Sequence, residues 1–303
     1  MILPPHLAVS FPSYISLGPY RVHPHIFFEA LAYLIAFGVY LLLRRRFGDS
    51  LVIPLRWAVI AAAVAGAALG SKLLYLLEDP QLTLHSLDNP AYLIGGKTIV
   101  GALAGGLIAV ELIKRYVGLH QSTGDLYAIP LALGIAIGRI GCFLTGLADN
   151  TCGTPTNLPW AINFGDGIPR HPTQLYEIIF LFALMPVLYW VLKRASRKDK
   201  IVILSEASAS RSGADAQSKD PALAVTATTP ARSSLRFLPG DAFKLFMVAY
   251  MFFRLLADFI KPYPRLFLGL GGIQWACVLI LLYYSRDVAR WLRPGFSSAR
   301  EKV

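Results

Sequence analysis

Charged residues are scarce in this sequence. They account for 16% of its 303 residues, whereas hydrophobic residues account for 55%, and the mean hydropathy is +0.53. Globular soluble domains average about 25% charged residues, so this composition excludes an ordinary soluble protein. Several apolar runs approach the ~20 residues that a helix needs to cross a bilayer. The sequence therefore predicts a helical membrane protein.

Cysteine is also scarce, and no metal-binding spacing is present among the three cysteines. We therefore expect no metal and no cofactor. A disulfide between Cys142 and Cys152 is possible on the outer side of the membrane, but their separation of ten residues does not establish one. The net charge of +11 fits basic cytoplasmic loops better than a nucleic-acid surface. We expect no nucleic-acid partner.

Seven apolar segments are predicted to span the membrane, at residues 24–43, 57–77, 99–113, 126–147, 175–192, 242–260 and 266–284. Basic clusters follow the first, third, fifth and seventh of them, beginning with Arg44, Arg45 and Arg46. Since basic loops remain cytoplasmic, the predicted fold is all-α and polytopic, with seven transmembrane helices, the N-terminus outside and the C-terminus in the cytoplasm.

Composition along the chain predicts four regions. Residues 1–23, rich in proline and aromatics, form a periplasmic segment suited to the membrane interface. The membrane domain comprises spans one to five in residues 24–204 and spans six and seven, with a cytoplasmic tail, in residues 235–303. Residues 205–234 contain mostly Ala, Ser, Thr, Asp and Pro and have little to bury, so we expect a disordered cytoplasmic loop there.

One arginine interrupts the fourth span. Arg139 ends an uncharged apolar run, and a charge at the centre of a membrane costs ~3 kcal/mol or more. Gly138 and Gly141 leave space on either side of it for backbone or for a ligand headgroup. A buried guanidinium flanked by small residues is typical of an anion site.

Other charges lie at a similar predicted depth. At 1.5 Å of rise per residue, Lys72, Arg139 and Arg254 lie about 18–22 Å above the cytoplasmic ends of their helices. The first turns of the two spans that descend from outside contain His25, Glu29, His171 and Glu177. These groups could be structural ion pairs, but buried pairs need not stabilise much after desolvation. We favour a polar cavity open to the outer leaflet, where arginine would bind a phospholipid phosphate.

Three local patterns give further expectations. If His171 caps the fifth helix, Pro172 takes the first helical position and Gln174 can reach back to the cap. Tyr250, Arg254 and Asp258 recur at four-residue spacing, which predicts an Arg254–Asp258 pair. The glycine-rich segment at residues 95–106 fits either a bent element lining a cavity or close helix packing.

These motifs resemble those of the prolipoprotein diacylglyceryl transferases of bacterial inner membranes. The matching pieces are GRIGCF at residues 138–143, RHPTQLYE at residues 170–177, and the Tyr250, Arg254, Asp258 stripe, with the glycine-rich segment also similar. The resemblance covers most of residues 15–290. It implies transfer of a diacylglyceryl group from phosphatidylglycerol to the lipobox cysteine thiol of a prolipoprotein, with release of glycerol phosphate. The partners implied are phosphatidylglycerol and a prolipoprotein signal peptide.

The resemblance also implies roles for individual residues. Arg139 would hold the lipid phosphate, and Arg254 would stabilise the charge of the departing glycerol phosphate. Either His25 or His171 could act as general base. The substrate-binding residues would be Arg139, Cys142, Tyr250, Gln174, Tyr176, Glu177, Lys72 and Asp258.

The sequence departs from the family pattern at five positions. It has Val100 in place of a histidine, Cys142 and Thr145 in place of two asparagines, His25 in place of a tyrosine, and Lys72 in place of an arginine. These differences suggest a divergent member or a paralogue.

Four alternatives stay open at this point. The protein could bind phospholipid headgroups or transfer to another acceptor without modifying lipoproteins. It could be a small-molecule transporter, although no inverted repeat is visible. Cys142 could be a nucleophile beside Arg139 or an inert buried thiol.

Overall fold

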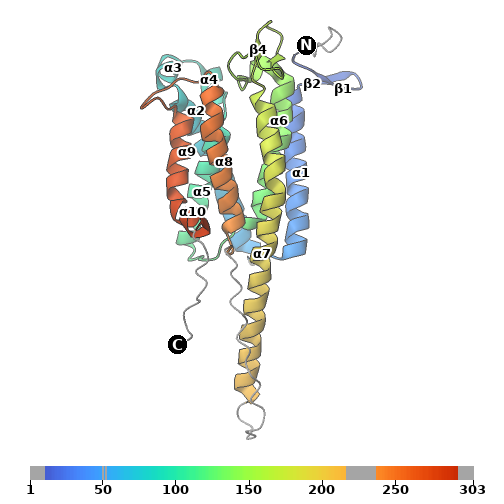
Figure 1. Cartoon of the computed structure of the whole chain (residues 1–303), viewed down its shortest axis with the longest axis vertical. Coiled ribbons are helices and arrows are strands. Elements are labelled where there is room, and N and C mark those ends of the chain that lie inside the picture. The colour runs from blue at the N-terminus through green and yellow to red at the C-terminus, as the bar shows by residue number, and fades with distance from the viewer. Residues whose placement is uncertain (1–10, 50, 52, 216–236, 293–303) are drawn as a thin grey trace, which may run out of the picture.

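The computed structural model describes residues 11–49, 51, 53–215 and 237–292, and most of them are helical. Helices occupy the positions of all seven predicted spans: α1 (Pro24–Phe47), α2 (Ile53–Glu78), α5 (Ile99–Tyr116), α6 (Asp125–Thr145), α7 (Thr173–Asp215), α8 (Asp241–Ala257) and α9 (Gly272–Tyr283). The short helical elements are α3 (Pro80–His85), α4 (Pro90–Ile94), η2 (Gly146–Asp149), η3 (Asp258–Ile260) and α10 (Ser285–Leu292). The long helices lie side by side in one bundle, with the short strands at its upper end (Figure 1).

Four helical segments are long and apolar enough to cross a membrane: Pro24–Phe47, Ile53–Glu78, Asp125–Asp149 and Thr173–Ser196. The chain is therefore a multi-pass helical membrane protein. Helices α5, α8 and α9 are shorter, with 18, 17 and 12 residues. The predicted seventh span begins too early, because residues 266–270 form a turn in which Phe267 pairs with Leu270. Glycines at 269, 271 and 272 disfavour helix there.

Helix α7 is much longer than the span predicted within it. Its 43 residues extend about 65 Å, roughly twice the ~30 Å thickness of a bilayer core. Its lower half projects beyond the bundle (Figure 1). Residues 205–215 belong to α7, so this helix overlaps the first part of the predicted cytoplasmic loop. The rest of that loop, residues 216–234, lies outside the described residues.

The bundle consists of two groups of helices joined by α8. In one group, α6 packs between α1 and α7. In the other group, α2 packs on α5, and α9 packs against α2 and α5. Helix α8 contacts α6, α7 and α9. Its buried face contains Phe246, Met247 and Tyr250, which pack in a core that includes Leu181 of α7 and Cys277 of α9. Tyr250 and Arg254 of α8 are therefore held in the interior of the bundle.

Close packing of α2 on α5 explains the glycine-rich segment. A Cβ atom at Gly105 would lie 2.8 Å from the Cα of Gly70 and still closer to the carbonyl oxygen of Gly66. Gly101 likewise contacts Gly70. Small residues allow two helix backbones to approach in this way. Of the two interpretations of residues 95–106, helix packing is the correct one from Ile99 onward.

The upper end of the bundle has two short hairpins. In the first, β1 (Ile15–Leu17) pairs with β2 (Tyr20–Val22), and Gly18 makes the turn with a φ of 60°. The predicted interfacial segment is thus a hairpin over residues 15–22, while residues 1–10 lie outside the described residues. In the second, β3 (Ile162–Asn163) pairs with β4 (Pro169–Arg170) just before α7. These hairpins make the fold mostly rather than entirely helical.

Candidate active site

A charge cluster occupies the interior of the upper bundle. Glu177 of α7 is at its centre, and its Oε2 atom lies 2.9 Å from Nε of Arg139 and 3.8 Å from Nη1 of Arg254. The hydroxyl of Tyr250 donates a hydrogen bond of 2.6 Å to the other carboxylate oxygen. All four residues are at most 5% exposed. Two arginines from different helices therefore share one carboxylate in a low-dielectric environment, where charge interactions are strong.

The end of α8 completes the charge cluster. Nη2 of Arg254 donates to Oδ1 of Asp258 at 2.9 Å, which confirms the predicted pair. Nζ of Lys261, also buried, lies 3.7 Å from the same oxygen. The cluster thus holds three cations, Arg139, Arg254 and Lys261, against two carboxylates, so it retains formal positive charge. Nε of Arg254 is buried without a hydrogen-bond partner among the described residues. An anion could satisfy both the charge and this donor.

A glycine on α6 brings α1 close to this cluster. A Cβ atom at Gly141 would lie 2.9 Å from Cβ of Phe28, 3.1 Å from the carbonyl oxygen of Pro24 and 3.2 Å from Cα of His25. At Gly138, by contrast, the space is open. We predicted that both glycines clear space around Arg139, but Gly141 serves the contact between α1 and α6. Pro24 occupies the first turn of α1, where its missing N–H costs nothing.

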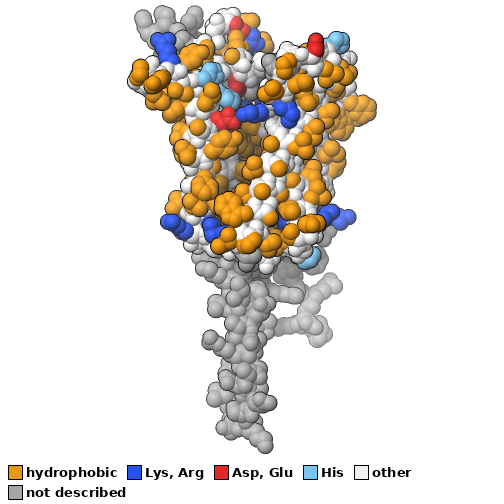
Figure 2. All heavy atoms as spheres, turned by 180° about the vertical axis from the view of Figure 1, so that it is seen from behind, with side chains coloured by type: hydrophobic (Ala, Val, Ile, Leu, Met, Phe, Trp, Pro, Cys, Tyr) orange, Lys and Arg blue, Asp and Glu red, His pale blue; other side chains and the backbone are white. Residues whose placement is uncertain are grey.

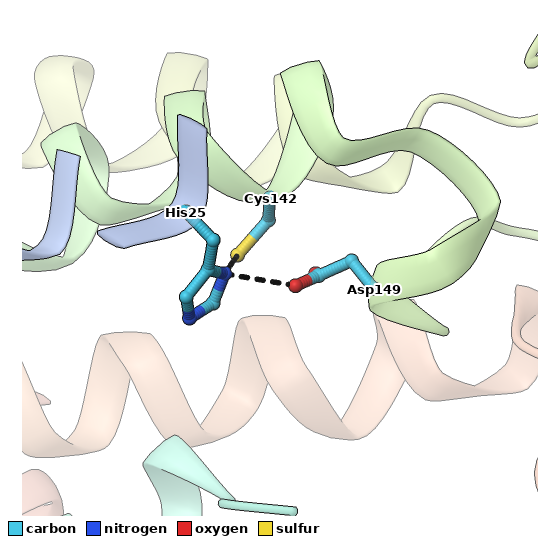
Figure 3. A group of neighbouring side chains, drawn as sticks. All are labelled: His25, Cys142 and Asp149. Atoms are coloured by element: carbon cyan, nitrogen blue, oxygen red, sulfur yellow. Dashed lines mark hydrogen bonds and ion pairs between the residues drawn. The ribbon is translucent and has the colours of Figure 1, made fainter. Parts of the chain in front are cut away.

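His25, Cys142 and Asp149 meet at this contact and are called here the His–Cys–Asp cluster (Figure 3). Nδ1 of His25 lies 2.9 Å from Oδ1 of Asp149 and 3.9 Å from Sγ of Cys142. Nη1 of Arg139 lies 3.7 Å from the same sulfur, so the two clusters are adjacent. The ligand atoms of the three residues lie within 4.8 Å of one another, a geometry that can hold a metal ion. The expectation of no metal site missed this group, because it rested on spacing in the sequence.

Two of the charges predicted to converge lie outside the charge cluster. Glu29 pairs with Lys97 at 3.0 Å and lies 3.7 Å from Nε2 of His25. Nζ of Lys72 donates to the carbonyl oxygens of Ile94, Gly95 and Gly96 at the end of α4. Figure 2 shows acidic, basic and histidine side chains grouped in the upper part of this face, above an apolar middle part and further basic side chains along the lower edge. Lys72 therefore donates to backbone in this structure, and the role predicted for it in substrate binding stays a prediction.

His171, Gln174 and Tyr176 belong to a network around the outer loop. Nδ1 of His171 lies 3.2 Å from the hydroxyl of Tyr176, which also accepts a 2.8 Å hydrogen bond from Trp160. The predicted cap is wrong, because α7 begins at Thr173 and Gln174 donates instead to Oγ1 of Thr151 at 3.1 Å. This network holds the loop against the upper end of α7.

The cysteines are all free thiols, so the possible Cys142–Cys152 disulfide is absent from the structure. Cys152 accepts a 3.5 Å contact from Nε2 of Gln174, and burial raises the pKa of its thiol. Val100, at the position of the family histidine, is 1% exposed and packs in the core near the start of α5.

Sequence reasoning missed Lys261 and Asp149 as members of the two clusters. Lys261 follows Asp258 by three residues, and Asp149 follows Cys142 by seven residues. Neither pair lies on one continuous α-helix, because α8 ends at Ala257 and Gly146, with a φ of 74°, ends α6. Helical spacing therefore did not signal either residue.

Comparisons with known proteins find the same family that the sequence motifs resemble. A sequence model described as prolipoprotein diacylglyceryl transferase matches residues 12–206. A phosphatidylglycerol–prolipoprotein diacylglyceryl transferase of Bordetella bronchiseptica is 36% identical over 192 residues, covering 57% of this chain and 70% of that protein. Relatives with the same name cover more of the chain. The protein of Polynucleobacter asymbioticus is 28% identical over 89% of this chain and 92% of its own length. That of Methylibium petroleiphilum is 28% identical over 94% and 96%.

Proposed function

The chain belongs to the prolipoprotein diacylglyceryl transferase family, and we propose that it moves a diacylglyceryl group from phosphatidylglycerol to the thiol of a lipobox cysteine. The product is a thioether, and glycerol phosphate is released. The observation that carries this assignment is the charge cluster, where three buried cations face two buried carboxylates and leave a formal positive charge in excess. A lipid phosphate is the anion present at this depth in quantity. The chain is thus a transferase of lipoprotein modification.

The two arginines have separate roles in the proposal. Arg139 binds the phosphate of the donor lipid, because its guanidinium can make two parallel hydrogen bonds to phosphate oxygens. Arg254 stabilises the negative charge that develops on the departing glycerol phosphate, a type of interaction that is worth several kcal/mol in a dry site. Asp258 orients Arg254 through the 2.9 Å hydrogen bond. Glu177 and Tyr250 occupy the anion position until the lipid arrives.

The acceptor side of the site is proposed at His25 and Cys142. Of the two histidines considered as general base, His25 lies next to Cys142 and hence next to Arg139. His171 contacts Tyr176 in the outer loop network, so with Gln174 it is proposed to shape the entrance rather than to move a proton.

The membrane arrangement follows from the positions of the basic residues. Arg44–Arg46 end α1, and Lys114 and Arg115 end α5, at the end of the bundle opposite the hairpins. Since basic residues remain cytoplasmic, seven spans with the N-terminus outside place the charge cluster in the outer half of the bilayer. The proposed location is the bacterial inner membrane, with the signal peptide of a prolipoprotein as partner. Residues 24–204 and 235–303 form the membrane domain in this proposal.

A complementation experiment tests the transfer reaction. A strain depleted of its own diacylglyceryl transferase would be supplied with this chain or with its Arg139→Ala variant at matched membrane levels. We expect growth and lipidated prolipoprotein with the native chain and neither with the variant. Purified protein that binds phosphatidylglycerol, but releases no glycerol phosphate with a lipobox peptide, would instead support the alternative of a lipid-binding paralogue.

A further inference from the structure

The His–Cys–Asp cluster brings three different ligand types to one point. Each residue comes from a different place: His25 from α1, Cys142 from the last turn of α6, and Asp149 from the end of η2 (Figure 3). Cys142 is buried, the Asp149 side chain is 9% exposed and that of His25 is 37% exposed. The three donor atoms therefore converge on one point, and the cluster is most exposed at its histidine.

The geometry argues against a catalytic triad made of the same residues. In a triad the nucleophile bonds one imidazole nitrogen and the carboxylate bonds the other. Here both Oδ1 of Asp149 and Sγ of Cys142 approach the single atom Nδ1 of His25, at 2.9 and 3.9 Å. One nitrogen cannot pass a proton between two partners that compete for it. Three donor atoms around a common centre are the arrangement expected for a bound cation.

Neighbouring side chains already orient the ligands as they would around a metal. Oδ2 of Asp149 accepts a 2.6 Å hydrogen bond from Thr151, which leaves Oδ1 directed at the centre. Thr151 is held in turn by Gln174 of α7. Nε2 of His25 lies 3.7 Å from Oε2 of Glu29, so this nitrogen faces a carboxylate while Nδ1 faces the centre of the cluster. Such outer contacts of histidine and carboxylate are typical of metal sites.

We propose that Nδ1 of His25, Sγ of Cys142 and Oδ1 of Asp149 bind one divalent zinc-like cation and leave a fourth position open. Zinc bonds of about 2.0–2.3 Å at tetrahedral angles separate ligand atoms by roughly 3.3–3.8 Å. The separations from Nδ1 of His25, 2.9 Å to Asp149 and 3.9 Å to Cys142, lie on either side of this range, and all three ligand atoms are within 4.8 Å of one another. One thiolate and one carboxylate balance the charge of the cation. Three protein ligands with an open position are typical of a catalytic zinc rather than a structural one.

The role of this site rests on the proposed function. The acceptor thiol binds at the open position and loses its proton to water, because a metal-bound thiol is deprotonated. Its sulfur then forms a bond to the glyceryl carbon of the donor lipid. The bond from that carbon to the phosphate oxygen breaks, and its electron pair leaves with glycerol phosphate beside Arg139 and Arg254. The thiol is thereby activated without a histidine at position 100, where this chain has Val100.

Metal binding can be measured independently of transfer. The full-length protein, purified in detergent and loaded with Zn²⁺ or Co²⁺, would be analysed for metal content by mass spectrometry and for a thiolate-to-cobalt absorption band. We expect one ion per chain and a band that the Cys142→Ala variant lacks. A Cys152→Ser, Cys277→Ala double variant leaves Cys142 as the sole cysteine of the chain and should retain the band. It therefore tests the ligand even if Cys142→Ala does not fold.

Two variants at residues other than the three ligands extend the test. Thr151→Val removes the hydrogen bond to Asp149 and should weaken zinc affinity by roughly 10–100-fold, whereas His120→Ala, at an exposed position outside both clusters, should leave the affinity unchanged. Native protein without bound metal and without a cobalt band would overturn the site, even if it transferred lipid normally. Metal binding without transfer would leave the site intact and count against the proposed function.

Discussion

Arg139 of α6 and Glu177 of α7 form an ion pair of 2.9 Å in the interior of the bundle, and neither residue is more than 5% exposed. Buried pairs of this kind gain little over an apolar contact, but removal of one partner leaves an uncompensated charge. The pair therefore links the stability of the empty protein to the site that is proposed to bind the lipid phosphate.

The first prediction concerns this carboxylate. Glu177→Gln removes the only negative charge shared by Arg139 and Arg254, so we expect a loss of about 3–5 kcal/mol in the free energy of unfolding. Thermal unfolding in detergent measures it. Glu111→Gln is the control, because its 3.0 Å pair with Lys114 is partly exposed and should be worth no more than about 1 kcal/mol. Equal effects of the two variants would contradict the interpretation of the charge cluster.

A second prediction separates charge from geometry at Arg254. Arg254→Lys keeps the positive charge but loses the planar fork that reaches both Asp258 and Glu177. We expect kcat to fall by about 10²–10³-fold, the effect of losing one donor to a developing anion. The readout is release of glycerol phosphate from phosphatidylglycerol with a lipobox peptide. Arg265→Lys, on an exposed loop, provides the matched control. A rate within a factor of two of the native protein would rule out the role given to Arg254.

Helix packing gives the third prediction. Gly105→Ala would place a methyl group 2.8 Å from Cα of Gly70, and overpacking of this kind costs about 1–3 kcal/mol. Gly38→Ala on α1 meets open space and should be neutral or stabilising by up to about 1 kcal/mol, since alanine favours helix. The two melting temperatures should therefore move in opposite directions. A drop of equal size in both would mean that α2 and α5 do not approach so closely.

The membrane arrangement supplies a fourth prediction. Alkaline phosphatase, which is active only outside the cytoplasm, would be fused after Asp88 or Asn157 in the upper loops and after Gly48 or Gly118 at the lower end. We expect activity from the first two fusions and none from the others, because the proposed arrangement places the lower end, with its basic residues, in the cytoplasm. Phosphatase activity of the Gly118 fusion together with an inactive Asn157 fusion would contradict the proposed orientation.

Much of the helical framework could be predicted from the sequence, since apolar length and basic clusters are local signals. The pair of Arg254 and Asp258 was predictable for the same reason, because four-residue spacing on a helix brings side chains together. Helix ends were less accurate. The turn at residues 266–270 and the extension of α7 to Asp215 depend on glycine and alanine content, which hydropathy alone does not weigh.

The site was only partly predictable, because depth in the membrane does not specify direction around a helix. Lys72 and Arg139 share a predicted depth, yet Lys72 points to the carbonyl oxygens at the end of α4. The contact between His25 and Cys142 joins residues 117 positions apart. It depends on how closely α1 and α6 approach, a quantity that no local pattern in either helix expresses.

That approach is set at Gly141, where α1 lies against bare backbone of α6. Any side chain there would move α1 outward and carry the imidazole of His25 away from the thiol of Cys142. The distance between two reactive groups on separate helices is thus controlled by a third position that contributes no functional group of its own. Substitution at Gly141 would change the spacing between α1 and α6. The arginines of the charge cluster and the ligands of the His–Cys–Asp cluster could then be uncoupled without substitution of any of those residues.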